Sequence, residues 1–149
     1  MATVFLEIAR VLRGTSNMTV VFHSAKASVW KTLTDAYTRA GFSVKMGSIL
    51  DKVQASFKQV VSNVSVKGDP LLLLSKTDSN LKLKRRRSDS EDIVRDMLAR
   101  ADAKSVVAQE RTAERLYSRY ILHCLQQGVV VSMNAESFYD QVRALERAA

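Results

Sequence analysis

The sequence contains a single cysteine and no long hydrophobic run, and both shortages restrict what the protein can be. Cys124 has no second cysteine to pair with, which excludes an internal disulfide, and its place in an apolar helical stripe predicts a buried small hydrophobic residue. No apolar run approaches the roughly 18 to 20 residues that cross a bilayer, and no cleavable signal segment opens the chain. We therefore expect a soluble, cytoplasmic protein without membrane contact.

The motifs that usually carry catalysis are also missing. The chain has no GxSxG elbow, HExxH motif, CxxC pair or closely spaced carboxylate pair. Gly14, Gly41 and Gly47 do not have the spacing of a GxGxxG motif or a P-loop. His123 and Cys124 are neighbours on a predicted helix, where their side chains diverge by about 100° and cannot readily share a metal ion. The sequence therefore shows no self-contained catalytic centre, no nucleotide-binding loop and no metal site.

Positive charge, in contrast, is in excess. The 149 residues include 23 Lys and Arg against 15 Asp and Glu, a formal net charge of +8. This balance favours an anionic partner, with nucleic acid or an acidic protein ahead of a membrane surface. Five cations lie close enough together to neutralise several DNA phosphates: Lys82, Lys84, Arg85, Arg86 and Arg87. Because acidic residues follow directly, a solvated linker with local ion pairs is the alternative interpretation.

The first part of the chain alternates helical and strand patterns. Apolar residues at three- and four-residue spacing predict helices over 2–13 and 27–40, which Gly14 and Gly41 end. Between the two helices, the β-branched run Met18–Phe22 is typical of a strand covered on both faces, as in a parallel sheet. A helix followed by a buried strand indicates an α/β unit.

The strand patterns continue to residue 76. Residues 42–46 alternate apolar and polar side chains, which predicts a half-buried strand. Residues 50–67 have no clean period, and we expect a long loop there with a strand at 60–66. The GDP sequence at 68–70 predicts a turn, and the four leucines at 71–74 predict a second buried strand. We interpret residues 1–76 as one α/β unit.

Helical patterns occupy the second part. Residues 77–90 are polar and strongly charged and predict a basic linker, and a capping-box pattern at its end places the start of a helix near Asp89. The strongest helical period covers 112–127 and ends at Gly128. Asn134 is a candidate N-cap for a last helix. We expect residues 91–149 to form an all-helical segment.

His23 and Ser24 directly follow the first predicted strand. Open α/β sheets bind ligands beyond the carboxyl ends of their strands, so these two residues form a candidate strand-end site. A histidine without an assigned partner is more often structural, and both interpretations stay open at this stage.

Two stretches carry a family resemblance: FLEIARVLRGTSNMTVVFHSAKASVWKTLTDAYTRAGFSV and KGDPLLLLSK. Together they resemble the C-terminal part of the catalytic domain of S-adenosylmethionine-dependent DNA methyltransferases that methylate the amino group of adenine or cytosine. In that family a helix leads into a sheet strand, a second helix ends in AGF, and two strands follow, the last after GD. The second half is similar to a helical segment of some large members. The resemblance implies a partial Rossmann-like sheet of about three strands and two helices, followed by an all-helical segment.

The resemblance does not extend to the family's catalytic motifs. The tetrapeptide Asp/Asn-Pro-Pro-Tyr/Phe and the glycine-rich cofactor loop are absent, and the DPLL sequence at 69–72 lacks the second proline and the aromatic residue. No catalytic or cofactor-binding residue is therefore transferred to this chain. We expect the isolated chain to be inactive and not to bind S-adenosylmethionine.

Two functional hypotheses follow from the sequence. The first is a fragment or subunit of a DNA methyltransferase, which completes the fold and contacts DNA through the basic linker and residues 50–67. It needs an N-terminal segment or a partner subunit with the catalytic motifs, or self-association, to cover an exposed sheet edge and the helix at 2–13. The alternative is a non-enzymatic nucleic-acid-binding or adaptor module.

Overall fold

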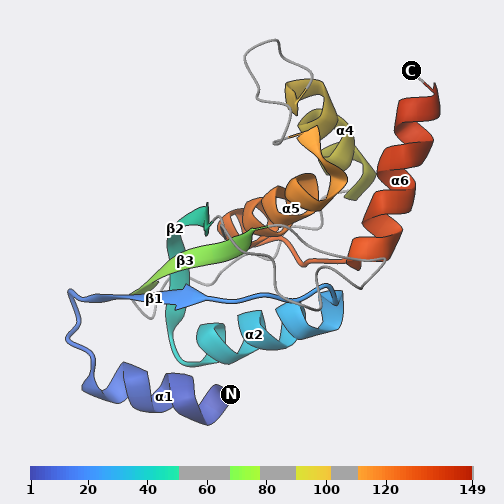
Figure 1. The fold of residues 1–149 in the computed structure, drawn as a ribbon. Coiled ribbons are helices and arrows are strands. Elements are labelled where there is room, and N and C mark those ends of the chain that lie inside the picture. Colours follow the sequence, from blue (N-terminus) through green and yellow to red (C-terminus); the bar gives the residue numbers. More distant parts are fainter. Residues whose placement is uncertain (51–67, 78–89, 102–110, 149) are drawn as a thin grey trace.

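The computed structural model describes residues 1–50, 68–77, 90–101 and 111–148. The first part contains helix α1 (Ala2–Val11), strand β1 (Asn17–Val21), helix α2 (Ala27–Arg39), and strands β2 (Phe42–Leu50) and β3 (Asp69–Lys76). Helices α4 (Ser90–Ala101), α5 (Ala113–Gln127) and α6 (Ala135–Ala148) follow (Figure 1). The predicted α/β class is confirmed, with the sheet in the first part of the chain and the later helices in the second.

The three strands form one sheet in the order β1-β3-β2, and the central strand is antiparallel to both neighbours. Strands β1 and β2 therefore run parallel to each other. Helix α2 joins them, so they form a β-α-β unit into which β3 is inserted. The register pairs Val21 with Leu71 on one side of β3, and Leu71 with Ser48 on the other.

The prediction that the first strand is buried on both faces is wrong. Strand β1 lies at the edge of the sheet, and its residues alternate between exposed and half-buried. Val21 points away from the core and is 48% exposed. Valine and threonine favour any pleated strand, so an apolar β-branched run does not by itself show how many faces are covered.

Strand β3 confirms the second predicted strand but begins earlier than expected. Leu72 and Leu74 are fully buried, whereas Leu71 and Leu73 are only half-buried. Asp69 and Pro70, which we predicted to form a turn, are the first two residues of the strand. A proline is tolerated at the first positions of a strand, where its missing N–H breaks little of the hydrogen-bond ladder.

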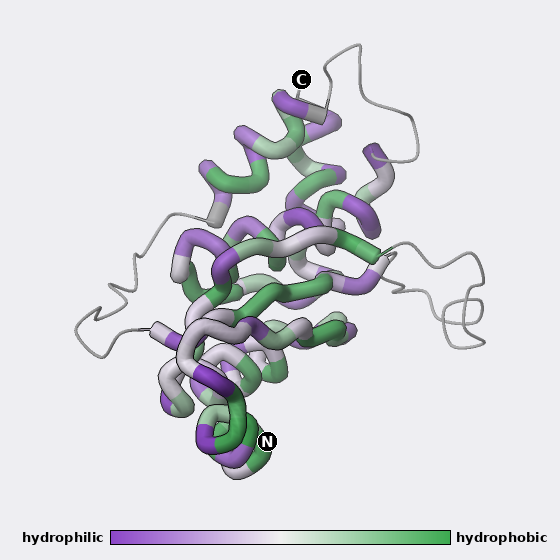
Figure 2. Tube along the Cα trace, turned by 90° about the vertical axis from the view of Figure 1, so that its left-hand side faces the viewer, coloured by the Kyte–Doolittle hydropathy of each residue, from purple (hydrophilic) through white to green (hydrophobic). Residues whose placement is uncertain are grey.

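Helices α2 and α5 supply most of the core that covers the inner face of the sheet. Trp30 and Leu33 of α2 are fully buried or nearly so, as are Leu116 and Ile121 of α5. Gly47 of β2 faces α5, and a Cβ atom there would collide with the side chain of Leu122. The glycine therefore allows α5 to lie directly on the strand. Hydrophobic segments run through the strands, while the helices alternate hydrophobic and hydrophilic residues (Figure 2).

Helix α5 matches its prediction closely, including its end. Gly128 follows the helix in the left-handed region at φ 66°, and the N–H of Val129 donates to the carbonyl of Cys124. Cys124 is buried, as predicted. Burial raises the pKa of its thiol from 9.0 to about 12. The thiol is therefore neutral at physiological pH, which excludes a nucleophilic role for it in the folded chain.

Asn134 stands at the predicted N-cap position, directly before α6, but its side chain bonds a different helix. Its side-chain oxygen accepts a hydrogen bond of 2.8 Å from the N–H of Ala27, the first residue of α2. Its backbone carbonyl accepts from Phe138 in the first turn of α6. Asn134 thus links the start of α2 to the start of α6, a contact between residues 107 positions apart in the sequence.

Helix α1 ends at Val11, two residues before the predicted end, and part of its predicted apolar face is not covered. Phe5 is its buried residue and packs edge-on against Tyr37 of α2, with the ring centroids 6.3 Å apart. Val4 and Val11 are 60% and 67% exposed. The sequence pattern identified the helix, and its partly exposed apolar face agrees with the expectation that this face is not fully covered within the chain.

Several predictions fall on residues outside the described ranges. These are the strand at 60–66 and nearly all of the basic linker, including Lys82. The helix that we expected to start near Asp89 is α4, whose described residues begin at Ser90. Across the part of the chain that the structure describes, no helix is both long and apolar enough to pass through a membrane.

Candidate functional site

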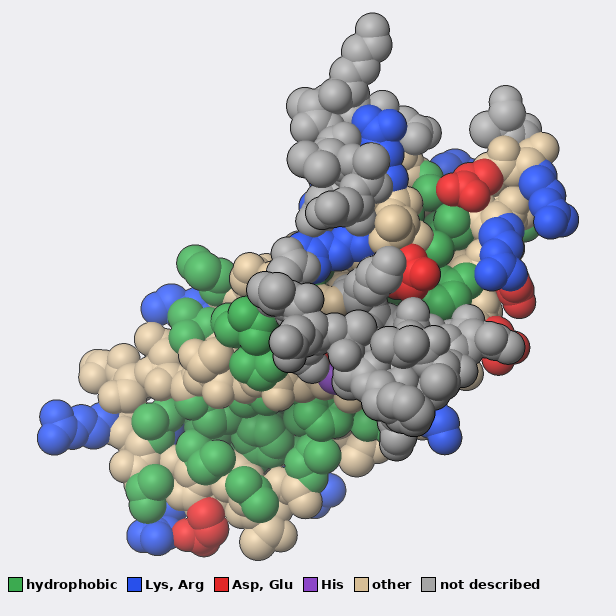
Figure 3. All heavy atoms as spheres, viewed as in Figure 1, with side chains coloured by type: hydrophobic (Ala, Val, Ile, Leu, Met, Phe, Trp, Pro, Cys, Tyr) green, Lys and Arg blue, Asp and Glu red, His purple; other side chains and the backbone are tan. Residues whose placement is uncertain are grey.

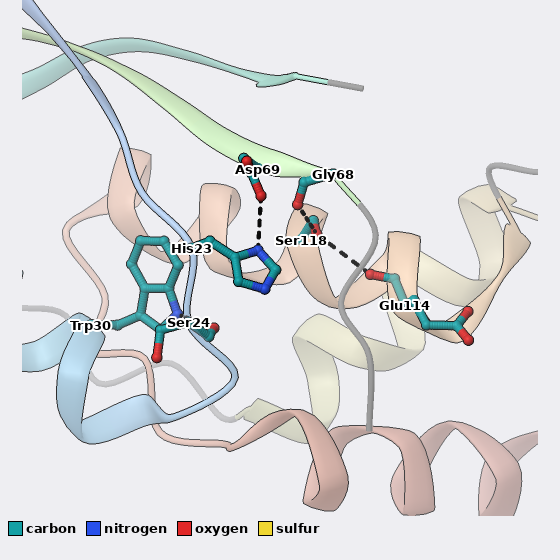
Figure 4. A network of polar contacts seen from close by, with 7 residues as sticks. All are labelled: His23, Ser24, Trp30, Gly68, Asp69, Glu114 and Ser118. Atoms are coloured by element: carbon teal, nitrogen blue, oxygen red, sulfur yellow. Dashed lines mark hydrogen bonds and ion pairs between the residues drawn. The ribbon is translucent and has the colours of Figure 1, made fainter. Parts of the chain in front are cut away.

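The strand-end site predicted at His23 lies where β1 leaves the sheet and β3 enters it. Nδ1 of His23 is 2.8 Å from Oδ1 of Asp69 (Figure 4). The two residues come together because β1 and β3 are antiparallel: the register that pairs Val21 with Leu71 places residue 23 opposite residue 69. The N–H of Phe22 donates to the carbonyl of Pro70, which extends the ladder to this point.

The two members of this pair have very different environments. The side chain of Asp69 is 5% exposed, whereas that of His23 is 36% exposed. A buried carboxylate is costly unless another polar group compensates it, and the imidazole supplies such a group. The contact is close, although Nδ1–H is not aligned for a linear hydrogen bond. The result is a half-exposed imidazole in close contact with a buried carboxylate.

Helix α5 supports the corner that carries Asp69. The hydroxyl of Ser118 donates to the carbonyl of Gly68 at 3.1 Å, and Ser118 is fully buried (Figure 4). The guanidinium of Arg115 lies directly against Gly68. A Cβ atom added to Gly68 would be only 2.5 Å from Nη1 of this arginine. Gly68 itself has φ +83°, a conformation that favours glycine. The start of β3 is therefore set by contacts with a helix from the other half of the chain.

Ser24, the other predicted member of the site, belongs to the local structure of its loop. Its hydroxyl accepts a hydrogen bond from the N–H of Lys26 at 3.1 Å. Its carbonyl accepts a hydrogen bond of 2.8 Å from Nε1 of Trp30 (Figure 4). Ser24 thus positions the loop between His23 and α2. The structure brings His23 to Asp69 and gives Ser24 a supporting role.

Asp69 is the residue that sequence reasoning missed. The sequence pattern indicates only a turn at Asp69, and it names no partner for His23. The two positions are 46 residues apart, and no spacing rule connects them; only the antiparallel register of β1 and β3 does. A polar residue directly before an apolar strand would have been the available signal, but such residues are common in turns.

Within residues 1–50, 68–77, 90–101 and 111–148, no group of three or more His, Cys, Asp or Glu is arranged to hold a metal ion. A cavity of about 40 Å³ lies between α2, the start of β2 and residues 128–131. A larger hollow of about 230 Å³ lies between α4 and α5. Both volumes are below the roughly 300 Å³ of a typical small-molecule site. The predicted cluster at Lys82, Lys84, Arg85, Arg86 and Arg87 lies outside the described residues.

The arrangement at His23 can exchange hydrogen bonds with a ligand. Comparison with protein-family models, with curated proteins and with solved structures gave no match to this chain.

Proposed function

We propose that the chain is the fold-completing C-terminal part of an amino-methylating DNA methyltransferase, which adds sheet strands and DNA contacts to a segment with the cofactor loop and the catalytic tetrapeptide. The order of elements supports this proposal. Helix α1 leads into β1, α2 connects β1 to the parallel strand β2, and β3 enters after Gly68 and Asp69. A helix that alternates with parallel strands is the repeating unit of a Rossmann-like sheet, which the sequence resemblance implies here.

The free edge of β1 is the observation that carries the proposal. Within the described residues, β1 pairs only with β3, so its outer edge is open. Its sequence, NMTVV, contains no charge and no proline, and its pairing with β3 shows no bulge. The outer strand on the other side, β2, has a register shift between Val44 and Met46 and a lysine at position 45. Bulges and lysines protect edges from further pairing, so β2 is protected and β1 is ready to accept another strand.

A hydrophobic surface lies next to this open edge. Figure 3 shows hydrophobic side chains gathered between β1 and α1. On α1, Val4 and Val11 are exposed and share one side of the helix, whereas Leu6, also exposed, lies on the opposite side. Scattered exposed apolar residues are common, but a contiguous apolar area indicates an interaction surface. A strand added to β1, together with its connecting helix, would cover this area.

The chemistry of amino methylation explains why the chain would need such a partner. The target base must leave the duplex, and the enzyme must hold its exocyclic amine against the cofactor's methyl group. A chain without the glycine-rich loop and the tetrapeptide lacks both the positioning and the electrostatic stabilisation of this step. We therefore propose that it acts only as part of a larger assembly.

Calorimetric titration of the full chain with S-adenosylmethionine and with a short DNA duplex tests this function. We expect no binding of the cofactor, and duplex affinity that falls steeply with salt. Each phosphate contact contributes about −0.9 to the slope of log affinity against log salt, so five contacts give about −4.5. Alanine at Lys82, Lys84, Arg85, Arg86 and Arg87 should remove most of this slope. Binding of S-adenosylmethionine would overturn the claim that this chain has no cofactor site. Absence of duplex binding would overturn the claim that it contacts DNA.

The isolated chain is also expected to self-associate through the uncovered surface of α1. Replacing Val4 and Val11 with glutamate should shift the chain toward monomer in sedimentation velocity runs, because both side chains are mostly exposed and the charges oppose apolar contact. Thr3→Glu is the matched control, since Thr3 is exposed on the same helix but is not apolar. A wild-type chain that stays monomeric at high concentration would contradict the expectation that this surface needs a cover.

A further inference from the structure

We propose that the hollow between α4 and α5 binds a phosphate group, either of a nucleic-acid backbone or of a small phosphorylated compound. Arg119 and His123 of α5 and Arg100 of α4 line this hollow. The inference does not depend on the proposed function, because it uses only the charge, the shape and the hydrogen-bond donors of the hollow. It assigns an anion contact to described residues outside the basic linker.

The hollow forms where α4 packs against α5 (Figure 1). Arg119 and His123 are four residues apart, so they lie on the same side of α5, about one turn from each other. Asp96 and Arg100 have the same spacing on α4 and line the opposite wall. The volume of about 230 Å³ suits a small anionic group better than a drug-sized ligand.

Apolar side chains lie between the charged ones. Met97 of α4 and Leu116 and Leu122 of α5 also line the hollow, and Leu116 is buried in the core. Apolar walls of low dielectric strengthen the attraction between fixed cations and a bound anion. Arg119 is half-buried, so salt screens its charge less than the charge of a fully exposed residue.

The lining side chains can donate several hydrogen bonds to phosphate oxygens. Nε of Arg100 donates to Oδ1 of Asp96 at 3.1 Å, and its Nη2 lies 2.9 Å from Oδ2. A guanidinium has five N–H groups in a planar fork, so a carboxylate on one edge of Arg100 leaves donors for a second anion. Arg119 also has an interaction of its own and adds its charge. The imidazole of His123 is exposed and can donate a further N–H.

Asp96 opposes a bound anion and therefore gives the inference a sharp test. Among the described residues that line the hollow, only Asp96 is acidic. Its pair with Arg100 is exposed, with 54% of the Asp96 side chain and 78% of the Arg100 side chain accessible, and such pairs contribute little in water. A phosphate oxygen can therefore compete with Asp96 for Arg100. Removing this carboxylate should strengthen binding, whereas removing a lining cation should weaken it.

Four variants of the full chain make this comparison. Arg119→Gln removes a lining cation, and Asp96→Asn removes the opposing carboxylate. The matched controls are Arg143→Gln and Asp140→Asn, which change the net charge equally at an exposed pair on α6, away from the hollow. Thermal unfolding shows whether each variant keeps the fold. If Arg119→Gln lowers stability, Arg119→Lys and the exposed Asp96→Asn still test the site.

The probes are inorganic phosphate and a short single strand of thymidine nucleotides, each at constant ionic strength. In ¹⁵N NMR spectra, the Nε–H groups of Arg100 and Arg119 should shift saturably with phosphate but not with chloride. Arg119→Gln should weaken binding, followed at Arg100, by at least about tenfold, the range of one hydrogen bond to a charged group. Asp96→Asn should tighten binding about two- to fivefold. Each control variant should change binding by less than about twofold.

The two probes distinguish the two sources of the phosphate. If the strand binds and Arg119→Gln weakens its binding, the phosphate belongs to a nucleic-acid backbone. If only inorganic phosphate shifts Arg119, it belongs to a small phosphorylated compound. The inference is wrong if neither probe shifts Arg119, or if Arg143→Gln weakens binding as much as Arg119→Gln does. In that case, duplex binding that depends on the basic linker alone would leave the proposed function intact.

Discussion

Replacing Trp30 with alanine is expected to lower the free energy of unfolding by about 3–5 kcal/mol, the range for removal of a fully buried large aromatic residue. Trp30 is 0% exposed, and its ring packs edge-on against Phe22, with the centroids 5.3 Å apart. Its indole N–H also donates to the carbonyl of Ser24 at 2.8 Å. The substitution would therefore leave both a cavity under the sheet and a loop carbonyl without its donor.

Urea denaturation followed by circular dichroism measures this effect. Trp30→Phe should lose less, about 1–2 kcal/mol, because it keeps most of the apolar volume but not the indole N–H. Lys31→Ala is the control on the same helix, because Lys31 is exposed, and it should change stability by less than about 0.5 kcal/mol. If Trp30→Ala lowers the free energy of unfolding by less than about 1 kcal/mol, the claim that this side chain is central to the core is wrong.

Gly68→Ala is expected to destabilise the protein by about 2–5 kcal/mol, through two separate effects. At φ +83° an alanine is strained, which costs about 1–2 kcal/mol. Its Cβ atom would also be 2.5 Å from Cγ2 of Ile49 and 2.5 Å from Nη1 of Arg115. Overpacking of this kind typically costs about 1–3 kcal/mol, although the end of the arginine can move.

Two other glycines separate these effects. Gly41 has the same φ of +83° but open space where a Cβ atom would lie, so Gly41→Ala should show the backbone strain alone. Gly14 has neither feature, and Gly14→Ala should be close to neutral. Chemical denaturation of the three variants should therefore rank them in the order Gly68, Gly41, Gly14. Equal losses at Gly68 and Gly41 would show that the contact with Arg115 and Ile49 contributes nothing.

Helix prediction succeeded where a helix buries a broad face. The period over 112–127 identified α5 and its end at Gly128, since eight residues of this helix are buried and their spacing is visible in the sequence. For α1 the same pattern located the helix, and the exposed Val4 and Val11 agree with the expectation that part of its apolar face is not covered within the chain. Periodicity shows which side chains share a face; it does not show whether a neighbouring element covers that face.

Strand prediction had a similar limit. The apolar run at 18–22 identified β1, but its place at the sheet edge depends on where β3 inserts, 50 residues later in the chain. The insertion of β3 between β1 and β2 follows no local signal. It results from packing of the inner face against α2 and α5, which no single segment specifies.

The sequence by itself determined the alternation of helices and strands, the burial of Cys124, the excess of positive charge and the candidate residue His23. Local propensity, period and composition are properties of neighbouring residues, so they can be recognised without a structure. The tertiary structure alone decided that β1 has an open edge, that Asn134 bonds the start of α2, and that Asp69 contacts His23. Each of these depends on contacts between residues far apart in the chain, which form only when the strands pair and the helices pack against the sheet.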